Sequence, residues 1–469
     1  MNDLCRLSAS EMLVLLRKRE LSCRELLEAH VAQIERLNPK INAIVTTTFE
    51  SALQTAIELD SKSKLDKALF GLPVAHKDLL STKNIRTTYG FPPLANFLPK
   101  HDAWIVSRMR NAGAVMVGKT NVPEFGAGSH TFNRVFGATR NPYDLTRTVG
   151  GSSGGAAAAL ASRIIPIADG SDTGGSLRNP AAFCNVVGFR PSAGRVPQGP
   201  HADPWTDLSQ LGPMARTVDD VALLFSVLAG PDSRAPRALD TPGSEFKELP
   251  PVSLKGLKVA FSEDFGLLPV EKPVREAISS FAAILEREGA HVCVDTPNLA
   301  DGRRIFHILR GIGFRKRFFN FSANEFKELK QTIRWNIDAG NALQLEDLEW
   351  AMAARSNLVN QIIEFFLNYD VWIGPATQVM PFPVEVDWVR EIEGRQMSNY
   401  IEWMESCSLI SITGLPTLSL PAGFHSGLPV GIQVIAPIRQ DHFLLRVSKA
   451  MESVTNFQAE QPQLLELNN

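Results

Sequence analysis

Two short turns rich in glycine and serine are the stretches of this 469-residue sequence whose residue types and spacing suggest chemistry. The first, residues 150–155, contains Ser152 and leads into an alanine-rich segment; the second, residues 170–176, ends at Ser176. A flexible linker would be expected between polar neighbours, whereas glycines directly before a helix let the backbone approach a ligand closely. A serine beside a row of backbone N–H groups can attack a carbonyl carbon while those groups hold the oxyanion. The two turns therefore predict one shared acyl-transfer site.

A serine nucleophile needs a base, and Lys77 is the candidate. It follows an apolar, strand-like run at residues 71–76; taken alone, it would be interpreted as a solvated lysine at a strand end. In apolar surroundings the charged form of a lysine is disfavoured, so its pKa falls and the neutral amine can accept a proton. His76 would point to the other face of the strand, and we expect it to be structural.

Two other motifs match the sequence but not their usual context. Residues 113–120 fit the phosphate-loop pattern, yet the four intervening residues are a β-forming apolar run and Pro123 follows, so we expect a strand and then a surface turn. Residues 150–154 fit the G-x-S-x-G nucleophile elbow of α/β-hydrolases, but no strand-like run precedes them. An esterase of that kind would need a histidine base, of which His442 is the best placed, and it stays an alternative.

The pattern along the chain predicts elements that would position these residues. The first 65 residues show helical spacing, with helices expected over 10–19 and 22–37, each beginning with a serine suited to N-capping. Short apolar runs follow at 72–75, 114–117 and 164–167, and others near the C-terminus at 417–421 and 431–434. Strands alternating with helices predict an α/β sheet covered by helices on both faces, which the C-terminal strands complete.

Composition excludes several classes of function. With 44% hydrophobic and 21% charged residues and a formal net charge of -2, the chain lacks the basic excess of nucleic-acid binders. It holds no uncharged apolar run of about 18 residues, so no membrane span is expected. Five scattered cysteines without CxxC spacing indicate neither disulfides nor zinc, and with no visible secretory signal they favour a cytoplasmic location.

At this point the motifs resemble a known family, the amidase signature family of serine amidohydrolases. The resemblance spans most of the chain and says least about residues 230–400. The segments that carry it are 71–78, 87–90, 118–125, 136–142, 150–155, 172–178, 188–192, 212–214, 414–417 and 427–433.

The resemblance implies a Ser–cisSer–Lys triad, with a cis peptide bond before the middle serine. It also implies an α/β/α fold around a mixed central sheet, and a protein that often forms homodimers. The triad would be Ser176, Ser152 and Lys77; the oxyanion hole would be the backbone N–H groups of Thr173, Gly174, Gly175 and Ser176; and supporting positions would be Ser153, Asp172 and Arg178. Neither a cofactor nor a metal is implied.

The predicted function is hydrolysis of a carboxamide-type C–N bond through an acyl-enzyme on Ser176, with anilide, carbamate and ester substrates left open. The alternative within the family is a subunit of a glutamine-dependent transamidase, which would need partner subunits. We expect one domain over residues 1–469, divided into N-terminal helices (1–65), a signature core (66–225), a variable pocket region (230–400) and C-terminal strands and helix (401–455).

The partner is expected to be a small amide with an apolar or aromatic group, because small-ligand pockets are mostly apolar. Each aromatic residue taken singly is more often part of the core. Candidate pocket residues are Gly126, Gly128 and Ser129, together with Phe314, Phe318, Trp335 and Trp403.

Overall fold

The computed structural model describes residues 3–200 and 204–466, and its centre is an eight-stranded mixed sheet in the order β12-β11-β13-β17-β16-β9-β10-β8. Strand β11 is parallel to both neighbours, and the remaining pairs are antiparallel. The C-terminal hairpin β16–β17 lies inside this sheet, as the sequence predicts. Its strands are β8 (Ile167–Asp172), β9 (Val187–Arg190), β10 (Gln210–Ala215), β11 (Lys258–Phe261), β12 (His291–Val294), β13 (Val371–Pro375), β16 (Thr417–His425) and β17 (Leu428–Ile435).

The strand that ends in Lys77 belongs to a different sheet. Strand β2 (Pro73–Lys77) pairs with β3 (Val115–Thr120), which pairs with β1 (Ile44–Thr47), so the expectation of a single sheet was wrong for these strands. Asp169 of β8 joins the two sheets: one carboxylate oxygen accepts from the Lys77 N–H at 2.9 Å, and the other lies 2.5 Å from Nδ1 of His76.

Two local expectations need correction. Residues 113–120 do form a strand rather than a phosphate loop, but residues 121–123 after it are buried and not a surface turn. The apolar run 164–167 is mostly not a strand, because Pro166 interrupts it and Ile164 is buried beside α2, where its carbonyl lies 2.9 Å from Nδ1 of His30. Strand β8 begins only at Ile167.

Helices cover both faces of the central sheet, and two adjacent residues of β9 show how. Gly188 faces α6 (Arg178–Phe183), while the Phe189 ring packs edge-on against Phe225 of α7 (Val218–Leu228), with centroids 4.8 Å apart. Successive side chains of a strand point to opposite faces, so α6 and α7 lie on opposite sides. Helix α5 (Gly154–Ala161) contacts α6, whereas α8 (Lys272–Arg287) and α14 (Asp441–Thr455) contact each other, and α14 contacts α7.

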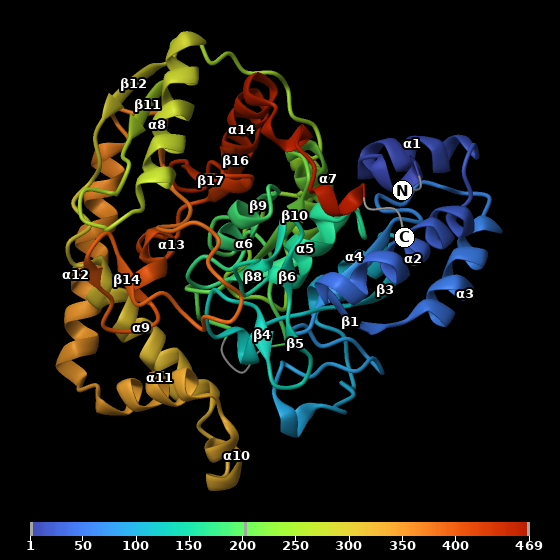
Figure 1. Cartoon of the computed structure of the whole chain (residues 1–469), viewed down its shortest axis with the longest axis horizontal. Coiled ribbons are helices and arrows are strands. Elements are labelled where there is room, and N and C mark those ends of the chain that lie inside the picture. Colours follow the sequence, from blue (N-terminus) through green and yellow to red (C-terminus); the bar gives the residue numbers. More distant parts are fainter. Residues whose placement is uncertain (1–2, 201–203, 467–469) are drawn as a thin grey trace.

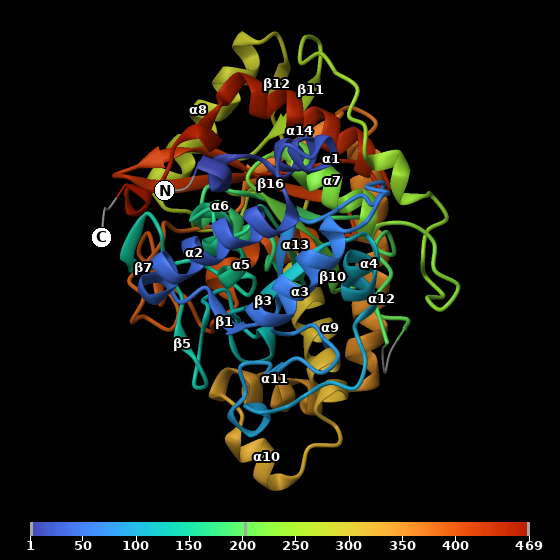
Figure 2. The same cartoon turned by 90° about the vertical axis from the view of Figure 1, so that its right-hand side faces the viewer.

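The remaining helices lie at the two sides of this core. In Figure 1 the N-terminal helices are at the right and the long α12 at the left, and Figure 2 shows α3 lying over β3. These outer helices are α1 (Ala9–Lys18), α2 (Cys23–Ile41), α3 (Phe49–Asp60), α4 (Trp104–Asn111), α9 (Gly302–Arg317), α10 (Ala323–Glu328), α11 (Gln331–Ala342) and α12 (Leu345–Phe365). Helix α13 (Glu405–Ser411), by contrast, is buried along its whole length. Three two-stranded pairs complete the fold: β4 (Phe132–Asn133) with β5 (Gly137–Ala138), β6 (Arg140–Asn141) with β7 (Asp144–Thr148), and β14 (Glu391–Ile392) with β15 (Arg395–Gln396).

Serine caps begin the first two helices. Helix α2 starts after Ser22, as expected, whereas α1 starts after Ser8 rather than at residue 10, because Ser8 and Glu11 form a capping box. Within residues 3–200 and 204–466, no helix is both long enough and apolar enough to cross a membrane. The single-domain division stays a prediction.

Close packing of α6 on the sheet yields a stability prediction at Gly188. A Cβ added there would lie 2.2 Å from the Leu177 carbonyl oxygen, so Gly188→Ala must displace the turn directly after Ser176. We expect a loss of about 1–3 kcal/mol in the free energy of unfolding, measured by urea denaturation. Gly313→Ala is the matched control in α9, because nothing lies within 4 Å of its added Cβ. Equal stability of Gly188→Ala and the unsubstituted chain would contradict the packing argument.

Candidate active site

Lys77 is fully buried at the end of β2, and its amine is surrounded by serine oxygens. Its Nζ lies 2.9 Å from Oγ of Ser152, 2.7 Å from Oγ of Ser153 and 2.9 Å from Oγ of Ser171. The Ser171 carbonyl oxygen is a further acceptor at 3.3 Å. The strand-borne lysine and the first serine turn are therefore in direct contact.

The burial of Lys77 changes its proton affinity. Removal from water lowers its pKa from the ordinary 10.5 to about 7, against the opposing charges of Asp172 and Asp169. Neither carboxylate forms an ion pair with the amine, because each is bonded to other groups. Lys77 can therefore shed its proton near neutral pH, which the oxygen cage alone would not achieve.

The two serine turns are held together by their backbones. The Gly151–Ser152 peptide bond is cis, and the Ser153 N–H donates to the Ser176 carbonyl at 3.2 Å. Ser176 is 9% exposed, and its hydroxyl makes no hydrogen bond with any residue in the described part of the chain. Gly126 also lies at this turn, since a Cβ added to it would be 3.4 Å from Oγ of Ser152.

The turn before Ser176 differs from expectation at one donor. The Gly175 N–H donates to Oδ1 of Asp172 at 2.8 Å, so this group is not available to an oxyanion in the structure. Among the described residues, the N–H groups of Thr173, Gly174 and Ser176 have no acceptor. These three donors remain the predicted oxyanion hole.

Asp172 organises that turn through two buried arginines. Arg178 donates through Nε at 3.0 Å and Nη2 at 2.9 Å, while Nη1 of Arg190 lies 3.4 Å from Oδ1. Burial would raise the pKa of Asp172, but Arg178 and Arg190 hold it well below its ordinary value. Arg178 in turn donates to Gln433 at 2.5 Å and Ser411 at 2.6 Å, which ties the turn to the C-terminal part.

Sequence reasoning missed four of these groups: Ser171, Asp169, Arg190 and Gln433. Asp169 and Ser171 are two residues apart on β8, so their side chains share one face of the strand, and both contact Lys77. A strand predicted over residues 167–172 would have placed them together. Arg190 and Gln433 come from segments that the resemblance includes, without a local reason to single them out.

The largest cavity beside these turns has a volume of ≈ 590 Å³. Ser171 and Thr173 form part of its wall, opposite residues of α9. Of the predicted aromatic residues only Phe314 lines it, because Phe318 packs edge-on against Phe125 and Trp403 against Phe382 in the core. Trp335 packs against Tyr400 away from this wall.

The predicted substrate loop at residues 126–129 is not part of that wall. Ser129 is buried, and its hydroxyl donates to Sδ of Met404 and accepts from Asn179, both at 2.8 Å, so it holds no free group for a ligand. Gly128 lies near Nζ of Lys330, 3.7 Å from an added Cβ. Of the three predicted loop residues, Gly126 is the one shown beside Ser152, and substrate contact by this loop stays a prediction.

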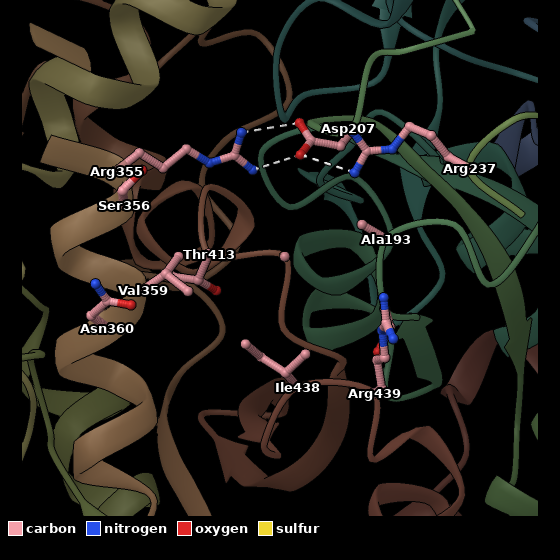
Figure 3. A pocket seen from close by; sticks show the side chains of 12 residues that line it. Ala193, Asp207, Arg237, Arg355, Ser356, Val359, Asn360, Thr413, Ile438 and Arg439 are labelled. Carbon is pink, nitrogen blue, oxygen red and sulfur yellow. Dashed lines mark hydrogen bonds and ion pairs between the residues drawn. The ribbon is translucent and has the colours of Figure 1, made fainter. Parts of the chain in front are cut away.

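A second cavity has a volume of ≈ 490 Å³, and no residue of the two serine turns lines it. Figure 3 shows the side chains of its wall. Across it, Arg355 of α12 forms a two-bond ion pair with Asp207, at 3.1 and 3.0 Å, and Arg237 approaches the same carboxylate at 3.3 Å. Thr206 and Leu208, on either side of Asp207, line the first cavity. The ion pair therefore supports one wall of the cavity beside the serines.

The histidine required by the esterase alternative is elsewhere. Nε2 of His442 lies 2.9 Å from the Glu248 carbonyl, and no hydrogen bond connects His442 with either serine turn in the described part of the chain. Among residues 3–200 and 204–466, no group of three or more His, Cys, Asp and Glu residues is arranged to hold a metal ion.

The α/β fold with helices on both faces of a mixed sheet agrees with what the resemblance to the amidase signature family implies, and comparison with known proteins shows the same family. The amidase family model matches residues 25–445, and the chain belongs to this family. A glutamyl-tRNA(Gln) amidotransferase subunit from Geobacillus stearothermophilus is 33% identical over 488 aligned positions, covering 97% of this chain and 99% of the relative. The corresponding protein of Carboxydothermus hydrogenoformans is 34% identical, covering 98% and 100%.

Solved structures give the same family with different named substrates. A bacterial aryl acylamidase of the amidase signature family superimposes with a TM-score of 0.90 at 27% identity, covering 99% of both chains. A 6-aminohexanoate cyclic dimer hydrolase superimposes with 0.86 at 26% identity, covering 99% and 100%. The glutamyl-tRNA(Gln) amidotransferase subunit from Thermotoga maritima gives 0.77 at 28% identity, covering 97% and 96%.

The buried Asp172 cluster yields the second prediction. Asp172→Asn removes the only negative charge shown to pair with Arg178 in the described residues, and it leaves two buried guanidinium groups uncompensated. We expect a loss of about 3–5 kcal/mol in the free energy of unfolding, measured by denaturant titration. Asp144→Asn, in an exposed ion pair with Arg147, should cost less than about 1 kcal/mol. Similar losses for both variants would contradict a special role for the buried cluster.

Proposed function

We propose that this chain hydrolyses carboxamide-type C–N bonds through an acyl-enzyme on Ser176. The observation that carries the proposal is the fully buried Lys77 amine, 2.9 Å from Oγ of Ser152 and with its pKa lowered to about 7. A neutral amine in that position can take a proton from Ser152, which makes Ser152 a relay to a neighbouring hydroxyl.

The proposed reaction moves one proton along that relay in each direction. Ser152 accepts the hydroxyl proton of Ser176 as its own proton passes to Nζ of Lys77, and Oγ of Ser176 bonds to the carbonyl carbon. Backbone N–H groups of Thr173, Gly174 and Ser176 hold the resulting oxyanion. When the C–N bond breaks, Ser152 donates a proton to the departing amine and regains one from Lys77. Water then releases the acyl group by the same steps, with its proton taken by the relay.

Asp172 and Arg178 are proposed to position this machinery rather than to react. The carboxylate closes the turn by accepting from the N–H groups of Gly175 and Leu177, at 2.8 and 3.1 Å. The N–H groups of Thr173, Gly174 and Ser176 have no acceptor among the described residues, so they are available to an oxyanion. Ser153, bonded to Lys77, is proposed to fix the amine beside Ser152.

A second candidate function is that of one subunit in a glutamine-dependent amidotransferase. The full-length similarity to curated amidotransferase subunits favours it, while the higher TM-score of the aryl acylamidase favours a hydrolase. Release of 4-nitroaniline from a simple acyl anilide by the purified chain alone separates the two, because a subunit that depends on partners would show no turnover without them. No turnover of any amide, ester or carbamate would contradict the hydrolase proposal.

Covalent labelling tests the nucleophile. The unsubstituted chain should be labelled by a fluorophosphonate probe. Ser176→Ala should lose the label because it removes the proposed nucleophile, whereas the hydroxyls of Ser152, Ser153 and Ser171 are all hydrogen-bonded to Lys77. Ser356→Ala, on α12 and distant in the fold, should be labelled like the unsubstituted chain. Intact-mass spectrometry measures the adduct. Persistent labelling of Ser176→Ala would place the nucleophile elsewhere.

The pKa of Lys77 predicts a pH profile. Only the neutral amine accepts a proton, so kcat/KM for an anilide should fall as pH decreases through about 7, the pKa of Lys77, and should level off above it. Lys77→Met should lose most of the activity and this titration with it, while thermal unfolding shows that the fold persists. A profile that is flat across neutral pH, or a titration that survives in Lys77→Met, would return a histidine base to consideration.

A further inference from the structure

Arg310 of α9 is a buried cation without a carboxylate partner among residues 3–200 and 204–466. Arg310 is only 6% exposed to solvent. Nε donates to Oδ1 of Asn336 at 2.9 Å and Nη2 to the Tyr400 hydroxyl at 2.7 Å, both neutral acceptors. Nη1 has no acceptor in the described part of the chain. Besides these acceptors, its described neighbours include the rings of Phe306, Phe314 and Tyr400, which carry no net charge. A buried guanidinium with only neutral partners is costly, so it is suited to bind an anionic ligand group.

The position of Arg310 connects it with the proposed active site. It lines the ≈ 590 Å³ cavity together with Ser171 and Thr173. One turn earlier on α9, the Phe306 ring lies against the serine turn, since a Cβ added to Gly174 would be 2.8 Å from it. The Arg310 guanidinium lies 5.8 Å from the centroid of that ring. The cation and the serine turn therefore both lie close to one aromatic ring.

The charge of the cavity wall is one-sided. Arg310 and Arg317 both line it, and none of the described residues that line it is Asp or Glu. Arg317 also donates to the Phe125 carbonyl at 3.2 Å. The rest of the wall is largely neutral, with apolar side chains such as Leu309 and Phe314. Such a wall attracts an anion and repels a cation.

We propose that the substrate is an amide bearing a carboxylate, and that Arg310 binds this carboxylate while the scissile carbonyl lies at Ser176. This inference rests on the proposed function and narrows it. A guanidinium held by Asn336 and Tyr400 presents its remaining N–H groups in a fixed plane, which suits a carboxylate. The apolar part of the wall then contacts the chain between the amide and the carboxylate. The carboxylate belongs to the acyl part or to the amine part of the substrate, and the test separates these two sources.

The test compares pairs of substrates of equal chain length, one ending in a carboxylate and the other in a methyl group. The mono-4-nitroanilide of glutaric acid against that of valeric acid probes the acyl side; N-butyryl-4-aminobutyrate against N-butyryl-butylamine probes the amine side. In one pair the carboxylate should raise kcat/KM by about 10- to 100-fold, as expected for hydrogen bonds to a charged group. Arg310→Gln should remove this preference, mainly by raising KM for the charged substrate. It should change kcat/KM for the neutral substrate less than about threefold. Arg310→Lys should keep part of it.

Arg315→Gln is the matched control, because Arg315 is on the same helix, is exposed and is not part of the cavity wall. It should leave the preference unchanged. Equal kcat/KM within both pairs in the unsubstituted enzyme would overturn the proposal, as would a preference that survives in Arg310→Gln.

A binding measurement on the unsubstituted chain keeps the inference separate from catalysis and from folding defects. Glutarate should bind, measured by calorimetry, and glutaramide should not; Arg310→Gln, with an unchanged unfolding temperature, should lose the glutarate signal. If no amide is hydrolysed but glutarate binds through Arg310, the proposed function fails and the anion site stands. If neutral anilides are hydrolysed and glutarate does not bind, the anion site fails and the proposed function stands.

Discussion

Everything in the proposed site depends on keeping the buried Lys77 amine hydrogen-bonded but without a salt bridge. Serine oxygens satisfy its donors without adding a charge, so burial lowers its pKa to about 7. A carboxylate paired with it would restore the charged form. The two arginines around Asp172 prevent this, because they bind the one carboxylate of the serine turn, and Asp169 is bonded to His76 and to backbone.

The glycines of the two turns are explained by how closely these segments must approach. A Cβ at Gly170 would lie 2.9 Å from Oγ of Ser153, and one at Gly155 would lie 2.3 Å from the backbone nitrogen of Asn121. Larger residues would push the lysine strand, the relay turn and the nucleophile turn apart. Glycine here permits contact between segments, which is why the run at 150–155 leads into a buried helix and does not act as a linker.

Local signals carried most of what could be predicted from the sequence, and long-range contacts account for the rest. Glycine spacing and an apolar run were enough to single out Ser152, Ser176 and Lys77, and the alternation of strands and helices gave the fold class. Strand pairing was not predictable, because the apolar runs 72–75 and 417–421 look alike in the sequence yet belong to strands of different sheets, β2 and β16. The contact of Asp172 with Arg190 was missed for the same reason, since it depends on which segments meet. The bond from the Gly175 N–H to Asp172 is local, and it was missed because the residue types do not give the conformation of the turn. Arg310 was not singled out from the sequence, because its neutral partners among the described residues become visible only in the folded structure.

The fold separates the residues proposed for chemistry from those proposed for selection of the substrate. The former lie at the ends of β2 and β8 and in the turns beside them, and Ser171 and Thr173 also line the cavity. Most of the cavity wall comes from other segments, among them α9 and residues 206–211. The Arg355–Asp207 ion pair joins residues 206–211 to α12. Both α9 and α12 lie within residues 230–400, where the resemblance to the family says least. Phe306 of α9 lies close to the serine turn at Gly174, but no hydrogen bond or ion pair joins α9 or α12 to Lys77 in the described part of the chain. We therefore expect residues of these helices to vary with little effect on Lys77. This separation is consistent with the variety within the family. Relatives and solved structures at 26–34% identity to this chain carry names as different as aryl acylamidase and glutamyl-tRNA(Gln) amidotransferase.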